Sequence, residues 1–214
     1  MDQPKNQWDF LPESLACTLD EIAIQKTYKK GTFLYHMGEE PKGLFFIFSG
    51  LVGVFSTTES GNEHLLRIFG ESQCMGHRSL LANENYHAGG KVLEDAVIGF
   101  VDAATVRTLI NENSDFAQRM ISKLAVELRR AEIRLAASSD KQVAERVAEA
   151  MLYLKIAFPE HKWTRNEIAY YCGSTAPTVI RTLADFEKRG FIEQHGRDIS
   201  ILDPESLKNF ANLS

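Results

Sequence analysis

Near residue 114 the sequence changes from a pattern of short strands and turns to the pattern of one long helix, and this change limits the available folds. The first part is punctuated by Gly31, Gly38, Gly43, Gly50, Gly53, Gly61, Gly70 and Gly76. From Phe116 to Leu135 there is no glycine or proline, and apolar residues recur at spacings of four, three, four, three and four. We therefore expect a β-rich unit followed by helices.

Short apolar runs predict an antiparallel sheet between about residues 30 and 102. The runs are Leu44–Phe48, Leu51–Ser56, Leu65–Phe69 and Ala96–Val101. Between the first two runs, Ser49-Gly50 is expected to form the turn of a tight hairpin. Many short strands punctuated by glycine are typical of a sandwich or a jelly-roll barrel. The predicted fold class is accordingly α+β, with an N-terminal antiparallel β jelly roll.

The long helical stretch carries an apolar stripe in heptad spacing. Its members are Ala117, Ile121, Leu124, Leu128, Ala131 and Leu135. With charged residues on its flanks, this stripe predicts a helix that pairs with its copy in a second subunit. The alternative is an amphipathic helix that lies on the core of its own domain. A polar break at Ala136–Asp140 is expected to act as a hinge, followed by a second helix over about Lys141–Ala157.

Residues 164 to 191 have the pattern of a helix–turn–helix. Thr164 is expected to cap a short helix, and Gly173 stands where the chain must turn sharply. Pro177 falls in the first turn of a second helix, where its missing N–H costs nothing. The buried stripe of that helix is predicted to be Val179, Leu183 and Phe186. Residues 191–202 then predict a two-stranded wing.

The opposite face of the second helix is suited to the major groove of DNA. The residues at its N-terminal end have small side chains, and Arg181 can reach guanine or a phosphate. The wing tip can touch the DNA backbone. The predicted DNA-binding residues are Thr164, Arg165, Ser174, Thr175, Ala176, Pro177, Thr178, Arg181, His195 and Arg197. The alternative is a plain three-helix domain that docks protein instead of DNA.

Several motifs along nearly the whole chain resemble the CRP/FNR family of bacterial transcription regulators. They are Gly31–Tyr35, Gly38-Glu39, Gly43–Ile47 with Ser49-Gly50, Gly76, the long helix and the Thr164–Ile192 module. The resemblance implies a cyclic-nucleotide-binding-like jelly roll over residues 1–113, a dimerisation helix over 114–138 and a winged-helix DNA-binding domain over 139–214. It also implies that an effector in the first domain re-orients the DNA-binding domains.

The segment that would hold the effector departs from the nucleotide-binding pattern of the family. Its candidate pocket residues are Gly76, His77, Arg78, Ser79, His87 and Ala88. In nucleotide-binding members a Glu holds the ribose and an Arg pairs with the cyclic phosphate, but here His77 and His87 stand at about those positions. A neutral imidazole replaces a bidentate guanidinium poorly. We therefore expect an unidentified small-molecule effector rather than a cyclic nucleotide.

Cysteine and histidine spacing limits the cofactors. Cys17 is alone near the N-terminus, so an FNR-like iron–sulfur cluster is excluded. Cys74 and His77 lie close in sequence, so a haem-dependent gas sensor is an alternative, although their spacing differs from that of the carbon-monoxide-sensing members. The histidines lack the spacing of a metal site. We expect no metal, no required cofactor, no catalytic residues and no enzyme activity.

Charge placement agrees with nucleic acid as the partner. The 214-residue chain has a net charge of −5, yet residues 162–197 hold six basic and four acidic side chains, a net +2. No signal peptide or membrane-length apolar run is visible, so we expect a cytoplasmic protein. Its expected partners are palindromic double-stranded DNA, a second copy of the chain and an effector, with RNA polymerase as a candidate. A signalling module of this architecture without DNA binding is the alternative.

Overall fold

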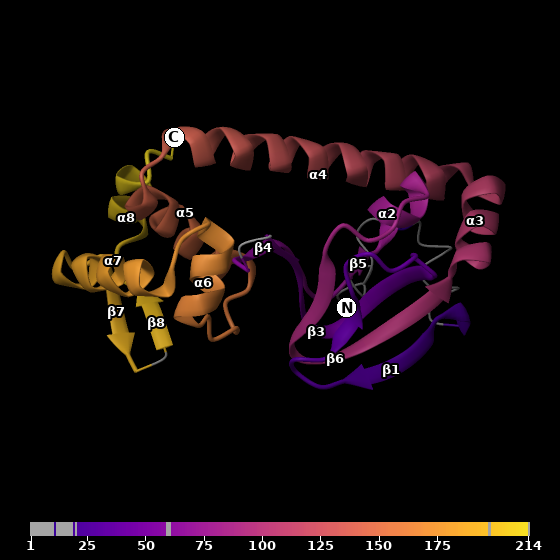
Figure 1. Ribbon diagram of the computed structural model, residues 1–214, viewed down its shortest axis with the longest axis horizontal. Coiled ribbons are helices and arrows are strands. Elements are labelled where there is room, and N and C mark those ends of the chain that lie inside the picture. Colours follow the sequence, from indigo (N-terminus) through magenta and orange to yellow (C-terminus); the bar gives the residue numbers. More distant parts are fainter. Residues whose placement is uncertain (1–10, 12–18, 20, 59–60, 197, 214) are drawn as a thin grey trace, which may run out of the picture. The chain divides into compact units, whose positions relative to one another are not determined.

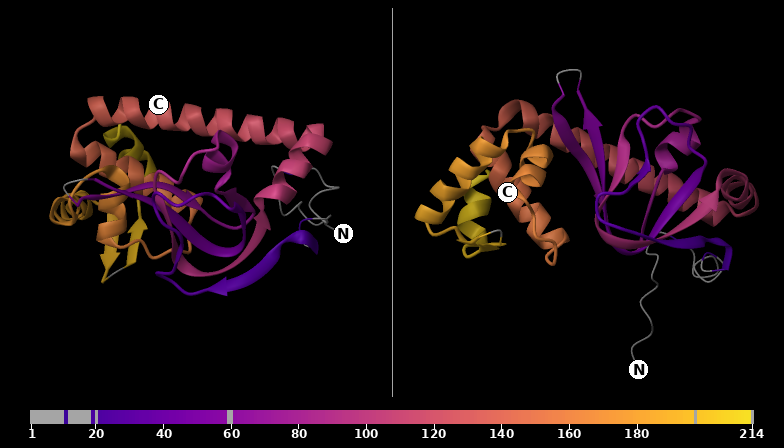
Figure 2. Two further views of the ribbon diagram at one scale, coloured as in Figure 1. Left: turned by 45° about the vertical axis from the view of Figure 1, so that its right-hand side comes forward. Right: turned by 60° about the horizontal axis from the view of Figure 1, so that its bottom comes forward.

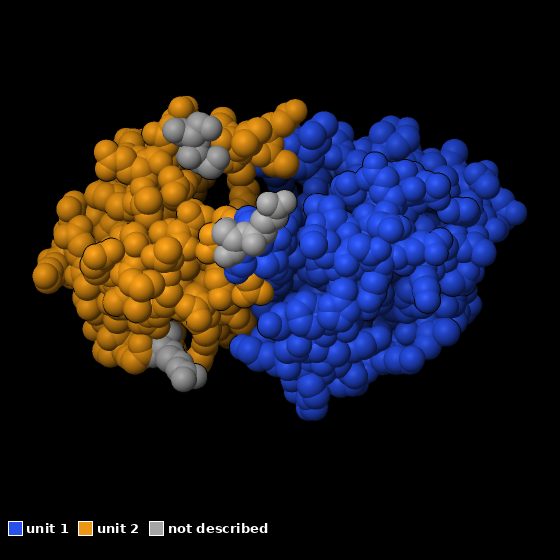
Figure 3. All heavy atoms as spheres, in the orientation of Figure 1, with its two compact units in different colours: residues 1–61, 66–130 blue, residues 62–65, 131–214 orange. Residues whose placement is uncertain are grey.

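The computed structural model describes residues 11, 19, 21–58, 61–196 and 198–213, with only the backbone of 137–139. Its elements, labelled in Figure 1, are β1 (Ile24–Tyr28), β2 (Phe33–Tyr35), β3 (Gly43–Thr57), β4 (Glu63–Phe69), β5 (Gln73–Met75), α2 (His77–Ala82), β6 (Gly89–Asp102), α3 (Ala103–Glu112), α4 (Ser114–Asp140), α5 (Val143–Ala157), α6 (Arg165–Cys172), α7 (Ala176–Lys188), β7 (Ile192–His195), β8 (Asp198–Ile201) and α8 (Pro204–Phe210). Figure 3 colours two compact units, Met1–Gly61 with Leu66–Arg130 and Asn62–Leu65 with Ala131–Ser214. The predicted α+β class is confirmed.

The sheet of the first unit is built around the long antiparallel pair β3 and β6. Its strand order is β1-β6-β3-β4, with β2 added to β6 and β5 added to β3. Side chains along β3 alternate between two buried faces, as the strand geometry requires. Leu44 and Phe46 pack with Phe116 of α4, whereas Phe45 and Ile47 belong to the other core cluster. The sheet is therefore covered on both faces, which explains the nearly continuous apolar run at the start of β3.

The predicted hairpin at Ser49-Gly50 is wrong, because β3 runs through this dipeptide without turning back. Its pairing with β6 shifts register between Ile47 and Val52, which marks a bulged region. Gly50 takes a φ of 87° there, and a Cβ at this position would lie 2.5 Å from the backbone oxygen of Asp95. Glycine is needed at a bulge with this close approach, so the signal taken for a turn marks an irregularity within one strand.

Helix α4 is unbroken in the left view of Figure 2 and extends through Asp140. The predicted hinge at Ala136–Asp140 is therefore wrong, since alanine and serine do not by themselves end a helix. The break lies at Lys141-Gln142, where the Gln142 N–H donates to the Glu145 carboxylate at 2.7 Å and α5 begins. Neither α4 nor any other helix of the described chain is long and apolar enough to span a membrane.

The second unit packs α5, α6, α7 and α8 around one core and attaches the β7–β8 hairpin as a wing. The predicted stripe of Val179, Leu183 and Phe186 is fully buried on α7. Trp163 is also buried, and its indole N–H donates to the Leu154 carbonyl at 3.3 Å. With one face of α7 fixed in the core in this way, its other face is left for contacts outside the unit.

Candidate functional site

The short helix α6 begins at a reciprocal cap. The Thr164 hydroxyl accepts from the Glu167 N–H at 3.2 Å, and the Thr164 N–H donates to the Glu167 carboxylate at 2.8 Å. Two N–H groups at the helix start, those of Thr164 and Glu167, are thereby satisfied. At its other end Gly173 has a φ of 65°, a left-handed conformation that lets the chain turn directly into α7. The predicted cap and turn are confirmed as structural features.

The outward face of α7 carries a connected row of polar side chains. The hydroxyls of Thr175 and Thr178 lie 3.0 Å apart, and the Arg181 guanidinium lies 3.4 Å from the Thr178 hydroxyl. Ala176 and Pro177 form the small N-terminal end of the helix, as predicted. Ile180 was missed by the sequence reasoning; its side chain is 53% exposed beside Arg181. An exposed isoleucine on such a face can contact a thymine methyl group.

Arg165 is turned toward the wing. Its guanidinium donates to the Gln194 side-chain oxygen at 2.7 Å and to the Gly196 carbonyl at 3.0 Å. Gln194 in turn donates through its N–H to the Glu187 carboxylate of α7 at 2.8 Å. Arg165 therefore ties α6 to the wing, a role that its spacing could not reveal.

The remaining predicted DNA-binding residues fall at the turn and at the wing tip. Ser174 is half-buried in the turn, where its N–H donates to the Ala169 carbonyl at 2.9 Å. The His195 side chain is exposed at the tip and lies 3.1 Å from the Glu193 carboxylate. Arg197 lies outside the described residues. The structure thus gathers Thr175, Thr178 and Arg181 on one face.

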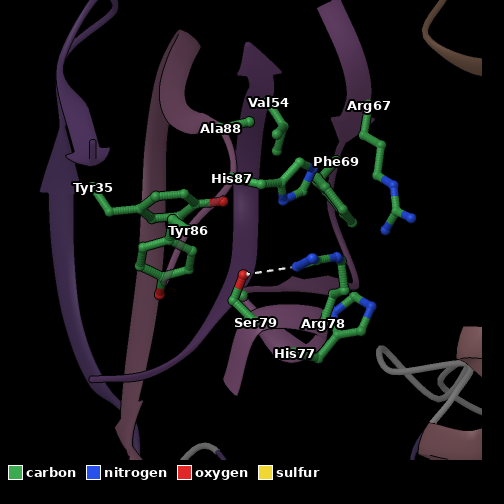
Figure 4. A pocket seen from close by; sticks show the side chains of 11 residues that line it. Tyr35, Val54, Arg67, Phe69, His77, Arg78, Ser79, Tyr86, His87 and Ala88 are labelled. Atoms are coloured by element: carbon green, nitrogen blue, oxygen red, sulfur yellow. Dashed lines mark hydrogen bonds between the residues drawn. The ribbon is translucent and has the colours of Figure 1, made fainter. Parts of the chain in front are cut away.

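A pocket in the first unit, shown in Figure 4, is lined by all six predicted effector residues. They are Gly76, His77, Arg78, Ser79, His87 and Ala88. The sequence reasoning missed the lining residues Tyr35, Val54, Arg67, Phe69 and Tyr86. One signal for Arg67 was available, because it is the single charge within the apolar run Leu65–Phe69. A lone charge in a strand of this kind indicates a side chain with a polar partner.

The pocket combines aromatic and cationic walls. The rings of Tyr35 and Tyr86 stack with centroids 3.7 Å apart, and Figure 4 shows the Tyr35 hydroxyl directed toward His87. Burial, followed by the nearby charges of Arg78 and Arg67, lowers the pKa of His87 below its ordinary value. His87 is therefore neutral at physiological pH. Burial raises the pKa of Tyr86 to about 12, so its hydroxyl stays protonated.

His77 faces the interior of the unit and α4. Its side chain is 1% exposed, and its Nε2 lies 2.9 Å from the Glu127 carboxylate. Burial opposes a charge on this ring, but Cys74 and Glu127 outweigh it and raise the pKa of His77 to about 9. Burial likewise opposes ionisation of Glu127, yet His77, Arg67 and Lys123 hold its pKa down at about 2. With Cys74 fully buried as well, the Cys74–His77 arrangement does not support the haem alternative.

The ion pair predicts a loss of stability at alkaline pH. In the unfolded chain His77 has its ordinary pKa near 6.5, so between pH 6.5 and 9 the folded state binds the extra proton. The contribution of His77 to the free energy of unfolding should be fully present below pH 6.5 and fall by up to about 1.4 kcal/mol per pH unit toward pH 9. Urea unfolding of the wild type and of His77→Gln at each pH measures this; parallel curves would contradict the assignment.

One position of the heptad stripe on α4 is exposed. Ile121 and Leu128 are each 60% exposed, and Leu135 is 70% exposed, although all three are large and apolar. Phe116 and Met120 are buried in the core instead. The heptad stripe and the core-facing side are therefore different faces of one helix.

Comparisons with known proteins agree with this architecture. A family model for the cyclic nucleotide-binding domain matches residues 25–113, and a model for the Crp-like helix-turn-helix domain matches residues 145–210. The CRP-like cAMP-activated global transcriptional regulator of Mycobacterium tuberculosis is 29% identical over 84% of each chain. The transcriptional activator protein anr of Pseudomonas aeruginosa is 26% identical over 89% of this chain and 82% of its own. The structure of FixK2 from Bradyrhizobium japonicum has a TM-score of 0.78 at 21% identity and covers 88% of this chain and 97% of that chain.

A cyclic nucleotide-binding-type unit joined to a winged helix–turn–helix defines a class of protein, the DNA-binding transcription regulators that carry such a domain. The chain belongs to the CRP/FNR family of these regulators. The predicted resemblance and the predicted DNA-binding module are thereby confirmed.

Proposed function

We propose that this regulator acts as a homodimer that binds a palindromic DNA site through α7 and changes its DNA affinity when an effector occupies the pocket. In this proposal residues 1–113 form the sensor, 114–138 the dimerisation helix and 139–214 the DNA-binding domain. It acts by binding and not by catalysis, in the cytoplasm, where its DNA lies. Contact with RNA polymerase stays a prediction.

The outward row on α7 carries this proposal. Thr175, Thr178 and Arg181 form a polar face opposite a fully buried stripe, with small residues at the helix N-terminus. This arrangement suits a recognition helix, whose first turns lie against base edges in the major groove. The target is expected to differ from that of members with a Glu at the second position of the helix, because Pro177 cannot accept a hydrogen bond from cytosine.

Dimerisation is supported by the exposed apolar stripe on α4. Three large apolar side chains at one heptad position, each more than half exposed, are costly in a monomer. A second copy of the same helix would bury them as a coiled-coil seam. A two-fold dimer places its recognition helices one DNA turn apart, which predicts half-sites roughly 34 Å apart.

A gel-shift titration of the full-length protein tests the proposal. The probe is a pool of duplexes with a randomised centre, at low salt, and the retarded duplexes are sequenced. We expect retardation and enrichment of an inverted repeat with that half-site spacing. Absence of retardation, with and without cell extract, would overturn the DNA-binding proposal and leave the signalling module. Enrichment of a single half-site would overturn the symmetric dimer.

A further inference from the structure

Arg67 belongs both to the pocket and to an ion-pair cluster on α4. From β4 it lines the pocket, and its Nη1 donates to the Glu127 carboxylate at 2.5 Å. Glu127 also meets His77 Nε2 at 2.9 Å and Lys123 Nζ at 3.5 Å. The Glu127 side chain is 13% exposed, so three cations share one nearly buried carboxylate. Any movement of Arg67 therefore changes the ion pairs of Glu127.

The pocket itself is rich in positive charge. Arg67 and Arg78 are cationic, and none of the lining residues in the described chain is acidic. The Arg78 guanidinium donates to the Glu84 carboxylate at 2.8 Å and to the Ser79 hydroxyl of the pocket lining at 3.4 Å. The Glu84 side chain is 59% exposed. Exposed pairs of this kind are weak and exchange readily. Figure 4 shows the Arg78 guanidinium beneath His87, within the pocket. An anionic group entering here would meet two guanidinium groups whose anionic partners, Glu127 and Glu84, both lie outside the lining.

We propose that the effector carries a carboxylate or phosphate group, and that this group competes with Glu127 for Arg67. The inference rests on the proposed effector pocket and adds the chemical class of the ligand and its route to α4. A guanidinium offers paired N–H donors to either anion. When Arg67 turns to the ligand, Glu127 keeps His77 and Lys123, so no buried charge is left without a partner.

The consequence for the helix follows from the position of Glu127. It directly precedes Leu128, an exposed member of the heptad stripe. Loss of the Arg67–Glu127 ion pair would remove one contact between β4 and α4 beside the proposed dimer seam. Pocket occupancy would thus be transmitted to the dimer through a single shared guanidinium. If Arg67–Glu127 were merely a structural ion pair, weakening it would lower stability without raising affinity for any anion.

Two variants separate these possibilities because they change anion affinity in opposite directions. Glu127→Gln weakens the internal competitor, so affinity should rise by about tenfold. Arg67→Gln removes the shared donor, so affinity should fall by about tenfold or more. Glu132→Gln is the charge-matched control, because it removes one negative charge from an exposed position of the same helix. Its affinity should stay within about twofold of the wild type.

The measurement is a titration of the 15N-labelled full-length protein with inorganic phosphate or with acetate, at constant ionic strength. Backbone N–H resonances of the lining residues Ser79 and Ala88 give the affinity of every variant. The Arg67 Nε–H resonance, assigned by its absence in Arg67→Gln, reports whether Arg67 itself takes part in the wild type and in Glu127→Gln. A saturable shift of this resonance with either anion supports the proposal. The anion that gives the shift, phosphate or acetate, identifies the class of the effector's group. An unmoved resonance through the millimolar range, or no gain of affinity in Glu127→Gln, overturns it. Gel shifts of the same samples test the proposed function separately. If the protein binds DNA but the Arg67 Nε–H resonance does not shift with either anion, the DNA-binding function stands and the anion proposal fails.

Discussion

Replacing Leu128 by aspartate should convert the proposed dimer into a monomer. Leu128 is 60% exposed at the centre of the heptad stripe, and a two-fold seam would bury both copies. Burial of each leucine contributes about 1.5–3 kcal/mol, so the pair is worth about 3–6 kcal/mol. The dissociation constant of the dimer should therefore rise by roughly 10²- to 10⁴-fold. Two facing carboxylates at the seam would add their desolvation and mutual repulsion.

Sedimentation equilibrium measures this change, with Val126→Asp as the matched control. Val126 is 40% exposed on α4 but lies outside the heptad stripe, at the position farthest from the expected seam. The control should remain a dimer with a dissociation constant close to that of the wild type. A dimeric Leu128→Asp protein would refute the seam, and a monomeric Val126→Asp protein would show that α4 uses another face.

Replacing Arg181 by alanine should remove most of the sequence preference while the dimer stays intact. Arg181 lies on the outward face of α7, and in the row of Thr175, Thr178 and Arg181 it alone carries a charged, bidentate donor. A well-placed arginine–guanine contact is worth about 1–3 kcal/mol of discrimination. The sequence preference should accordingly decrease by a factor of about 5 to 150 per half-site. Both half-sites of a palindrome are affected.

The measurement is the ratio of dissociation constants for the selected palindrome and a scrambled duplex at one salt concentration. Lys188→Ala is the control, because it removes a positive charge from the exposed last residue of the same helix. That variant should weaken both duplexes alike and leave the ratio unchanged, as expected for a phosphate contact. An unchanged ratio in Arg181→Ala would mean that other residues read the bases, with the exposed Ile180 as the next to test.

Local signals in the sequence determined the helices of the DNA-binding unit. The Thr164 cap, the Gly173 turn and Pro177 in the first turn each act within one helix end. Because capping and turn chemistry involve residues three or four positions apart, the sequence contains both partners of each interaction. The buried stripe of Val179, Leu183 and Phe186 was predictable for the same reason, since helical periodicity defines the face.

The tertiary structure alone decided which distant residues meet. Gly50 marks a bulge and not a hairpin turn because β3 pairs with β6, whose partner residues lie more than forty positions away. Likewise Arg67 and Glu127, sixty positions apart, come together only when α4 docks on the sheet. The sequence by itself therefore determined the family, the heptad stripe, the cap of α6 and the buried stripe of α7. The strand partners and the shared guanidinium of the pocket were decided by packing, because non-local contacts leave no periodic trace in the chain.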